Sequence, residues 1–254
     1  MCTGAQVIED AVRELWELGV GDGDLLFVHS KMGDASLPET SACLAALTQA
    51  VAESGTLAIP TFNFGFCSGK PYDYRKTPSE MGLLTELARR DPRARRIHHP
   101  IYSFALFGRE ADVLSKSIRN ISAFGDDSFF AELRRRNGKI LLINLEIREA
   151  FTFLHHVEEM SGCDYRYVKT FTGPVIDEKG RETLGTCKML VRNLEMGVET
   201  DAEPMGKRLD QLGLVKTGRL GRWKTRLLEA GLVFEAAKDA PRKEPDLLRR
   251  LNKR

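Results

Sequence analysis

Asp24-Leu-Leu-Phe-Val-His29 is a short, almost wholly apolar segment that begins directly after the glycine-rich stretch 19–23. A run in which nearly every residue is apolar is typical of a strand that is buried on both faces of a sheet. The segments 55–60, 102–107 and 139–145 are similarly apolar. Between and around them, amphipathic segments predict helices over 8–18, 40–52, 81–90, 111–117 and 128–136.

This alternation of strands and helices predicts an α/β fold with three α/β/α layers around a central mixed sheet. The C-terminal third has a different texture. Residues 167–176 and 183–191 predict a β-hairpin, with a helix over 223–230 and a final strand near 232–234. We therefore expect a single domain over 1–254, with the candidate motifs in 1–162, the hairpin and C-terminal elements in 163–240, and a basic tail in 241–254.

The composition favours a soluble enzyme, because 42% of the residues are hydrophobic, 29% are charged and the net charge is +2. No segment reaches the roughly 18 apolar residues of a membrane span, and the acidic, amphipathic N-terminus does not resemble a signal peptide. We expect a cytoplasmic location without membrane contact. The five cysteines are scattered without a C-x-x-C motif, which favours reduced thiols. The basic clusters at 89–96 and 241–254 carry no interleaved aromatic residues, so nucleic acid is not an expected partner.

The five histidines all lie next to predicted strands. His29 ends the first strand, His155 and His156 follow the strand at 139–145, and His98 and His99 precede a strand. In open α/β sheets, ligands bind outside the carboxyl ends of the strands. These positions indicate a site at that edge of the sheet.

The segment around 151–160 predicts a helix with a reactive face. At 3.6 residues per turn, Thr152, His155 and either Glu158 or Glu159 share one stripe. A carboxylate beside an imidazole fixes its tautomer and raises its basicity, which is the arrangement of a general base.

Two other chemistries have less support in the sequence. A metal site formed by His29, His99 and His155 remains an alternative, but the motif H-E-x-x-H is absent and no metal is expected. A serine or cysteine nucleophile is poorly supported, since G-x-S-x-G does not occur.

Several short segments between Asp24 and Gly162 occur together in a recognisable order. They are 27–30 (FVHS), 59–62 (IPTF), 78–82 (PSEMG), 96–100 (RIHHP), Ser103 with Ala105 and Gly108, 124–128 (FGDDS), 141–143 (LLI) and 152–158 (TFLHHVE). Together they resemble the aminoglycoside 3-N-acetyltransferase family, which uses acetyl-CoA and is unrelated in fold to the common GNAT acetyltransferases.

The resemblance implies roles for four residues in catalysis. His155 matches the general base and Glu158 its carboxylate partner, while Thr152 matches a hydroxyl near the thioester. His99 matches a position at the edge of the active site.

The resemblance also implies a site for coenzyme A. His29, Ser30 and Lys31 match the turn after the first strand, where backbone N–H groups suit phosphates. Ser103 and Thr152 complete the expected cofactor contacts. Acetyl-CoA is then the acyl donor, and transfer is direct, within a ternary complex.

The acceptor side is expected in the loop before Met81 and at Tyr102, where relatives often carry a histidine. This loop carries slightly more basic than acidic side chains, whereas a polycationic substrate favours acidic ones. We therefore expect the acceptor to be an anionic amino sugar, for example a nucleotide-linked one. The alternatives are a true aminoglycoside, a metal-dependent hydrolysis, or an inactive homologue that binds coenzyme A. The chain is expected to be a monomer or a homodimer. Candidates for acceptor binding are Asn63, Asp73, Arg75, Glu80 and Tyr102.

Overall fold

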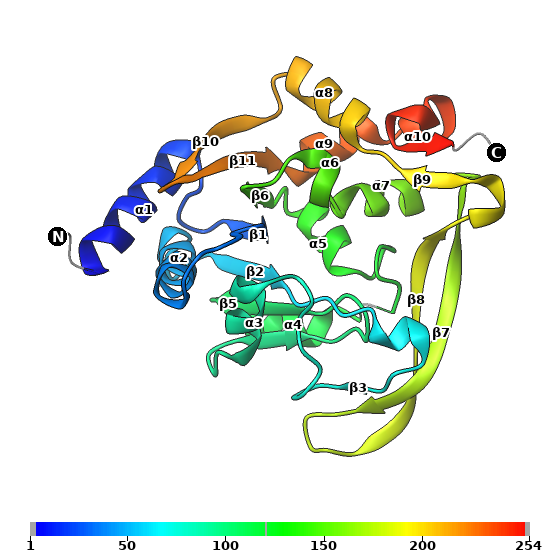
Figure 1. Cartoon of the computed structure of the whole chain (residues 1–254), viewed down its shortest axis with the longest axis horizontal. Helices are drawn as coiled ribbons and strands as arrows, with labels where there is room; N and C mark the ends of the chain where they lie inside the picture. The colour runs from blue at the N-terminus through cyan, green and yellow to red at the C-terminus, as the bar shows by residue number, and fades with distance from the viewer. Residues whose placement is uncertain (1–3, 120, 252–254) are drawn as a thin grey trace.

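The protein folds around one seven-stranded mixed sheet, as a computed structural model describes for residues 4–119 and 121–251. The strands of this sheet are β1 (Leu25–Ser30), β2 (Thr56–Pro60), β4 (Arg95–Ile97), β5 (Phe104–Gly108), β6 (Lys139–Ile143), β10 (Lys216–Leu220) and β11 (Trp223–Glu229). Their order is β10-β11-β6-β1-β2-β5-β4 (Figure 1). Central β1 pairs in parallel with β2 and β6, while β5 and β11 on either side run antiparallel.

Helices cover both faces of this sheet, so the predicted three-layer α/β/α fold is confirmed. One face is covered by α1 (Gly4–Leu18), α2 (Leu37–Ala50) and α3 (Leu83–Arg90). The other face is covered by α4 (Ala111–Ser117), α5 (Phe129–Arg135), α7 (Phe153–Ser161) and α9 (Ala230–Ala237). Shorter or peripheral helices are α6 (Ile147–Ala150), α8 (Glu203–Gln211) and α10 (Ala240–Lys243).

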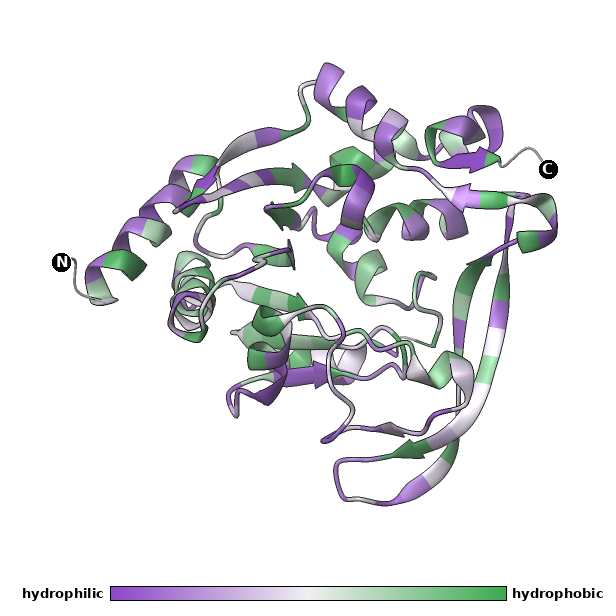
Figure 2. Cartoon of the chain, in the orientation of Figure 1, coloured by the Kyte–Doolittle hydropathy of each residue, from purple (hydrophilic) through white to green (hydrophobic). Residues whose placement is uncertain are grey.

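The central strand shows why its apolar sequence determines a buried position. Phe27 packs into the cluster beneath α5 and α7, whereas Leu26 and Val28 point into the cluster beneath α1 and α2. Successive side chains of a strand face opposite sides, so a strand with helices on both faces must be apolar throughout. Figure 2 shows the consequence, with hydrophobic residues on the central strands and alternating polar and apolar residues on outer helices such as α1.

The predicted hairpin forms a long two-stranded arm beside the sheet (Figure 1). Its strands are β7 (Arg166–Ile176) and β8 (Glu182–Arg192), and β3 (Tyr72–Asp73) adds to the outer end of β7. A separate pair joins β9 (Val198–Thr200) to β12 (Arg249–Leu251). Three short 3-10 turns complete the chain: η1 (Gly65–Ser68), η2 (Leu194–Met196) and η3 (Pro245–Leu247).

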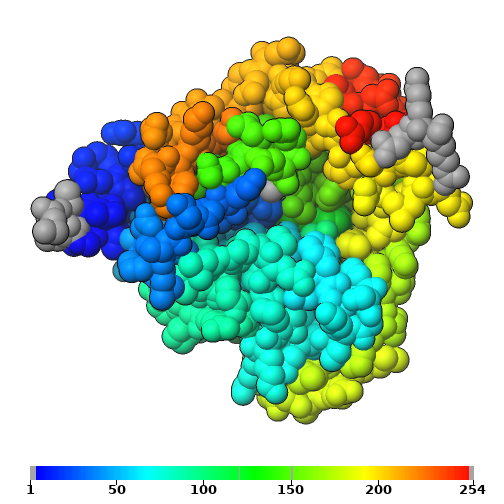
Figure 3. Space-filling model, in the orientation of Figure 1, coloured from blue at the N-terminus to red at the C-terminus, as the bar shows by residue number. Residues whose placement is uncertain are grey.

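Two predicted elements near the C-terminus are wrong. The segment predicted as a helix over 223–230 is strand β11, and the final strand predicted near 232–234 lies within helix α9. β11 extends the sheet because it pairs antiparallel with β6, and β10 pairs with it in turn. Figure 3 shows this hairpin, in orange, lying against the blue N-terminal helix.

The C-terminal basic segment is part of the fold as far as Leu251. Arg249 lies over the ring of Tyr165 at 4.9 Å, and Arg242 donates to the carbonyl of Ser161 at the end of α7. The rest of the predicted tail, 252–254, lies outside the described residues. Within the described residues, no helix is both long and apolar enough to cross a membrane.

All the histidines gather at one edge of the sheet. β4 runs in the same direction as β1 and β2, because it is antiparallel to β5, which is antiparallel to β2. His98 and His99 therefore follow the carboxyl end of a strand, whereas the sequence analysis placed them only before one. This edge carries the candidate site.

Candidate functional site

His155 lies in the first turn of α7, and one of its ring nitrogens is held by a carboxylate. Its Nδ1 is 2.7 Å from Oε2 of Glu158, one turn along the helix. A carboxylate accepts hydrogen bonds, so Nδ1 carries the proton and Nε2 presents its lone pair. The His155 side chain is 22% exposed, while that of Glu158 is only 2% exposed. The imidazole therefore meets solvent through a ring whose tautomer is fixed from behind, which is the geometry of a general base.

Glu158 is in turn held by Arg166, the first residue of β7. Arg166 Nε donates to Oε1 of Glu158 at 2.9 Å, and Arg166 Nη2 donates to Oγ1 of Thr200 at 2.7 Å. Burial raises the pKa of Glu158, but the hydrogen bond and charge of His155 and the charge of Arg166 lower it by more. The pKa is therefore below its ordinary value, and the carboxyl stays ionised. The hydrogen bonds thus run in one line from β9 through β7 to α7.

His155 lines two adjoining cavities. The larger, of about 580 Å³, is bounded by Phe64, Tyr102 and Arg166, together with residues of β8 and β9. The smaller, of about 150 Å³, lies beside α6 and the start of α7 and includes Thr152. Thr152 precedes α7 without capping it and is one of the residues that line this cavity. One imidazole can therefore serve two ligands that enter from different sides.

A third cavity, of about 280 Å³, lies at the turn after β1 and includes Ser30 and Lys31. Lys31 Nζ is 2.8 Å from Oε1 of Glu149 on α6. Glu149 also lines the smaller cavity beside His155. This exposed ion pair thus joins a residue that lines one cavity to a residue that lines the other.

Three other residues predicted to act in the site are buried and engaged in the fold. His29 is 5% exposed, and burial lowers its pKa to about 3, so its side chain is neutral and faces Phe27. His99 Nδ1 accepts the backbone N–H groups of residues 101 and 102, and its Nε2 is 3.3 Å from the Lys188 carbonyl. Ser103 is 1% exposed and is bonded to Thr61 and Arg96. All three side chains are buried, and Nε2 of His29 has no hydrogen-bond partner among the described residues.

The predicted acceptor residues are spread more widely than the sequence implied. Tyr102 lines the larger cavity, and Glu80 supports Phe64 there by accepting its backbone N–H. Asn63 shapes the same loop through bonds to the carbonyl of residue 78 and the N–H of Gly65.

Asp73 and Arg75 lie elsewhere. Asp73 pairs with Ile176 at the far end of β7, roughly 30 Å along the strand from Arg166. Its carboxylate accepts the N–H groups of Arg75 and Lys76, which closes a local turn. The structure therefore does not bring either side chain together with His155.

The sequence did not predict the bond of Arg166 to Glu158, the position of Thr200 or most of the β8–β9 wall. Arg166 is eight residues after Glu158, and helix α7 ends at Gly162 between them. Helical periodicity therefore cannot relate the two side chains. The local signal is limited to two charged residues, Asp164 and Arg166, after the helix-ending Gly162. Pairing of Arg166 with Glu158 depends on the angle between α7 and the hairpin, which no local pattern encodes.

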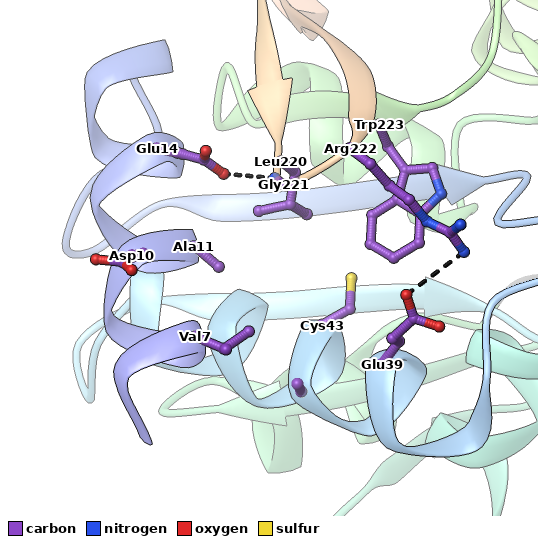
Figure 4. A pocket seen from close by; sticks show the side chains of 11 residues that line it. Val7, Asp10, Ala11, Glu14, Glu39, Cys43, Leu220, Gly221, Arg222 and Trp223 are labelled. Atoms are coloured by element: carbon purple, nitrogen blue, oxygen red, sulfur yellow. Dashed lines mark hydrogen bonds and ion pairs between the residues drawn. The ribbon is translucent and has the colours of Figure 1, made fainter. Parts of the chain in front are cut away.

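A different cavity, of about 450 Å³, lies on the other side of the molecule between α1, α2 and the turn joining β10 to β11. Figure 4 shows Cys43 and Trp223 pointing into it, with Glu14 bonded to the N–H of Gly221. Burial raises the pKa of Cys43 to about 12, so its thiol is not a nucleophile. None of its lining side chains is a histidine, and it has no part in the catalytic geometry.

The family is identified by comparison with known proteins. Residues 27–240 match the family model described as aminoglycoside 3-N-acetyltransferase. The chain belongs to this family. The resemblance inferred from the sequence is confirmed, and the protein is an acetyl-CoA-dependent N-acetyltransferase.

Individual relatives agree with this result. Aminoglycoside N(3)-acetyltransferase VII of Streptomyces paromomycinus is 30% identical over 65% of this chain and 64% of that protein. Aminoglycoside N(3)-acetyltransferase IX of Micromonospora chalcea is 25% identical over 92% of this chain and 93% of that protein. The crystal structure of aminoglycoside acetyltransferase AAC(3)-IIb superposes with a TM-score of 0.80 at 24% identity, over 93% of this chain and 97% of that one. The match to this structure supports the fold.

Proposed function

We propose that the chain transfers the acetyl group of acetyl-CoA to a primary amine of an aminoglycoside, with His155 as the general base. The observation that carries the proposal is the imidazole between two cavities, with Nδ1 held by Glu158 and Nε2 left for chemistry. An amine must lose a proton before or during its attack on a thioester, and a well-placed base contributes about 10²–10⁴ in rate.

Each bond change in this reaction can be assigned. The amine nitrogen attacks the carbonyl carbon of the thioester, and its proton passes to Nε2 of His155. The bond between carbon and sulfur then breaks, and the imidazolium returns the proton to the departing thiolate. Glu158 stabilises the positive charge on His155 between these two transfers. The products are an acetamide and free coenzyme A.

Direct transfer is favoured because the described cysteines are poor nucleophiles. Burial raises the pKa of Cys187 to about 12 and that of Cys163 to about 11. A protonated thiol does not form an acyl-enzyme readily. Both substrates must then be bound at once, one from each side of His155.

For the cofactor we propose the side of the site formed by the β1 turn and Thr152. Ser30 and Lys31 line one cavity there, and Thr152 lines the other. Lys31 offers an exposed positive charge for a phosphate, which would compete with Glu149 for its ammonium group. The smaller cavity suits the narrow thioester end of the cofactor.

For the acceptor we propose the larger cavity, whose volume is within the range of small-molecule sites. The named relatives favour an aminoglycoside over the anionic amino sugar expected from the loop charges. Two of those charges, on Asp73 and Arg75, lie away from the cavity. An anionic acceptor remains the second candidate because Arg192 lines the cavity, while Glu199 on the opposite wall is neutralised by Arg250.

Thiol release from acetyl-CoA tests the proposal directly. Aminoglycosides form one acceptor panel, and nucleotide-linked amino sugars form the other. Release with the first panel supports the proposal, and release only with the second replaces the acceptor by the anionic class.

A histidine substitution then tests the mechanism. His155→Ala should lower the rate about 10²–10⁴-fold while calorimetry shows unchanged binding of coenzyme A. His98→Ala is the matched control, since this half-exposed ring stacks on Tyr74 and pairs with Glu178 away from the cavities. Full activity in His155→Ala would refute the assignment of the base.

A further inference from the structure

Arg166 is the least expected member of the candidate site. Its side chain is 4% exposed and it faces a carboxylate that is 2% exposed, so neither charge is neutralised by solvent. A buried ion pair of this kind is weak evidence for stability, because removing both charges from water costs several kcal/mol per ion. Its retention next to a catalytic base therefore calls for a role other than stability.

The geometry gives Arg166 two tasks at once. Its Nε bonds to Oε1 of Glu158, which leaves Oε2 for Nδ1 of His155. Its Nη2 reaches Thr200 on β9, beside the wall of the acceptor cavity. The planar guanidinium holds these two donors at a fixed angle, which a flexible ammonium cannot do.

Glu158 would have more freedom without this contact. Oε2 of Glu158 is bonded to His155 and Oε1 accepts from Arg166, so loss of Arg166 would remove the donor to Oε1. A carboxylate that can rotate no longer fixes the Nδ1–H tautomer of His155 or supports the imidazolium at the right angle.

We infer that Arg166 is a positioning residue that fixes Glu158 for His155 and, through Thr200, aligns the catalytic helix with the wall of the acceptor cavity. This inference rests on the proposed role of His155 as the base. Arg166 itself lines the larger cavity, where its Nε donates to Glu158. Arg166 acts on the rate through the orientation of another side chain.

Arg166 is paired in the β7–β8 hairpin with a second arginine, Arg192, and the two side chains differ in burial. Arg192 lies directly opposite Arg166 in the register of β7 and β8, yet it is exposed and forms part of the cavity rim. Both arginines line the larger cavity, but Arg166 is buried and Arg192 is exposed. Only Arg166 is turned beneath the hairpin towards α7.

A double-mutant cycle tests the inference through activity. Arg166→Met should lower kcat about 10²-fold, within the range of a general-base contribution, with less than about a threefold change in KM for acetyl-CoA. Glu158→Gln should lower kcat similarly, and the double variant should be no slower than the worse single variant, because both act through His155. Additive losses in the double variant would show that Arg166 acts independently of Glu158 and would overturn the inference.

A spectroscopic readout separates this inference from the proposed acceptor. The Nδ1 proton of His155 gives a downfield proton signal when it is bound to a carboxylate, and this signal requires no substrate. The signal should be lost or broadened in Arg166→Met but kept in Arg181→Met, which removes an exposed arginine at the hairpin turn. An unchanged signal in Arg166→Met would overturn the inference whatever the acceptor is.

Two milder variants keep the test decisive if Arg166→Met does not fold. Arg166→Lys retains the charge but not the fork, so kcat should fall about tenfold with normal binding of coenzyme A. Thr200→Val removes only the outer hydrogen bond from an exposed position, and it should broaden the same proton signal. Wild-type kcat and signal in both variants would refute a positioning role.

Discussion

Three buried histidines predict that the protein loses stability on mild acidification. His29, His99 and His156 are 5%, 1% and 0% exposed. Burial lowers the pKa of His29 to about 3 and those of His99 and His156 to about 4. At His99 burial is the main cause of the lowered pKa, and Nδ1, which already accepts two backbone N–H groups, has no room for a proton. The native state therefore keeps these rings neutral well below pH 6.5.

The direction and size of the effect follow from proton linkage. The unfolded chain binds protons at these histidines below about pH 6.5, whereas the native state does not until it approaches the lowered pKa values. The contribution of these three histidines to stability is therefore fully present above pH 6.5, and it is lost as the pH falls below that value. Each histidine contributes about 1.36 kcal/mol per pH unit, or about 2 kcal/mol at pH 5, and the three together about 6 kcal/mol. This loss is large beside a total free energy of unfolding of about 5–15 kcal/mol, and it exceeds the lower end of that range.

Urea unfolding at pH 7.5, 6.5, 5.5 and 5.0 measures this dependence. The free energy of unfolding should fall by about 4 kcal/mol per pH unit between pH 6 and 5, before most carboxylates titrate. His156→Phe should reduce this slope by about one third, whatever it does to the absolute stability. His98→Ala, which changes a half-exposed ring, should alter the slope less. A slope of one proton or less in the wild type, or an unchanged slope in His156→Phe, would refute the reasoning.

Three further predictions address the fold and the chemistry. Gly108→Ala should lower the free energy of unfolding by about 3 kcal/mol, because φ is +107° and a Cβ would lie 2.2 Å from the carbonyl oxygen of Gly55. Gly69→Ala, at φ +82° with open space around it, should cost clearly less in the same denaturation assay, and equal losses would contradict the clash. Ser36→Ala should cost about 1 kcal/mol in thermal unfolding, since Ser36 and Glu39 form the capping box of α2. Incubation with EDTA should leave acetyl transfer unchanged, because no three His, Cys, Asp or Glu side chains in 4–119 and 121–251 are grouped to hold a metal; loss of activity that zinc restores would favour metal-dependent hydrolysis.

The sequence was informative wherever one element determines its own surroundings. The segment at 25–30 is apolar on both faces, and this property alone requires a strand with helices on each side. The stripe of Thr152, His155 and Glu158 is a property of one helix, and the bond between His155 and Glu158 spans three residues. Local periodicity was therefore sufficient to place His155 beside Glu158 or Glu159, and the family resemblance selected Glu158.

Prediction failed where pairing with a distant strand decided the structure. Residues 223–229 have charged and apolar residues at spacings that fit a helix, but they form β11 because β6 offers an unpaired edge. The following apolar residues of α9 then pack on the sheet near α5 and α7. The intrinsic preference of a short segment for helix or strand is weak, and tertiary contacts easily override it.

The sequence by itself determined the layered α/β fold, the hairpin and the catalytic stripe, because each depends on periodicity within one segment. The tertiary structure alone decided that Arg166 bonds to Glu158 and that Asp73 lies far from the cavity. It also decided that His99 is bonded to the Lys188 carbonyl and Ser103 to the Thr61 carbonyl. These facts depend on how the hairpin crosses the end of the sheet. That crossing is fixed by contacts between residues far apart in the chain, and no local pattern records it.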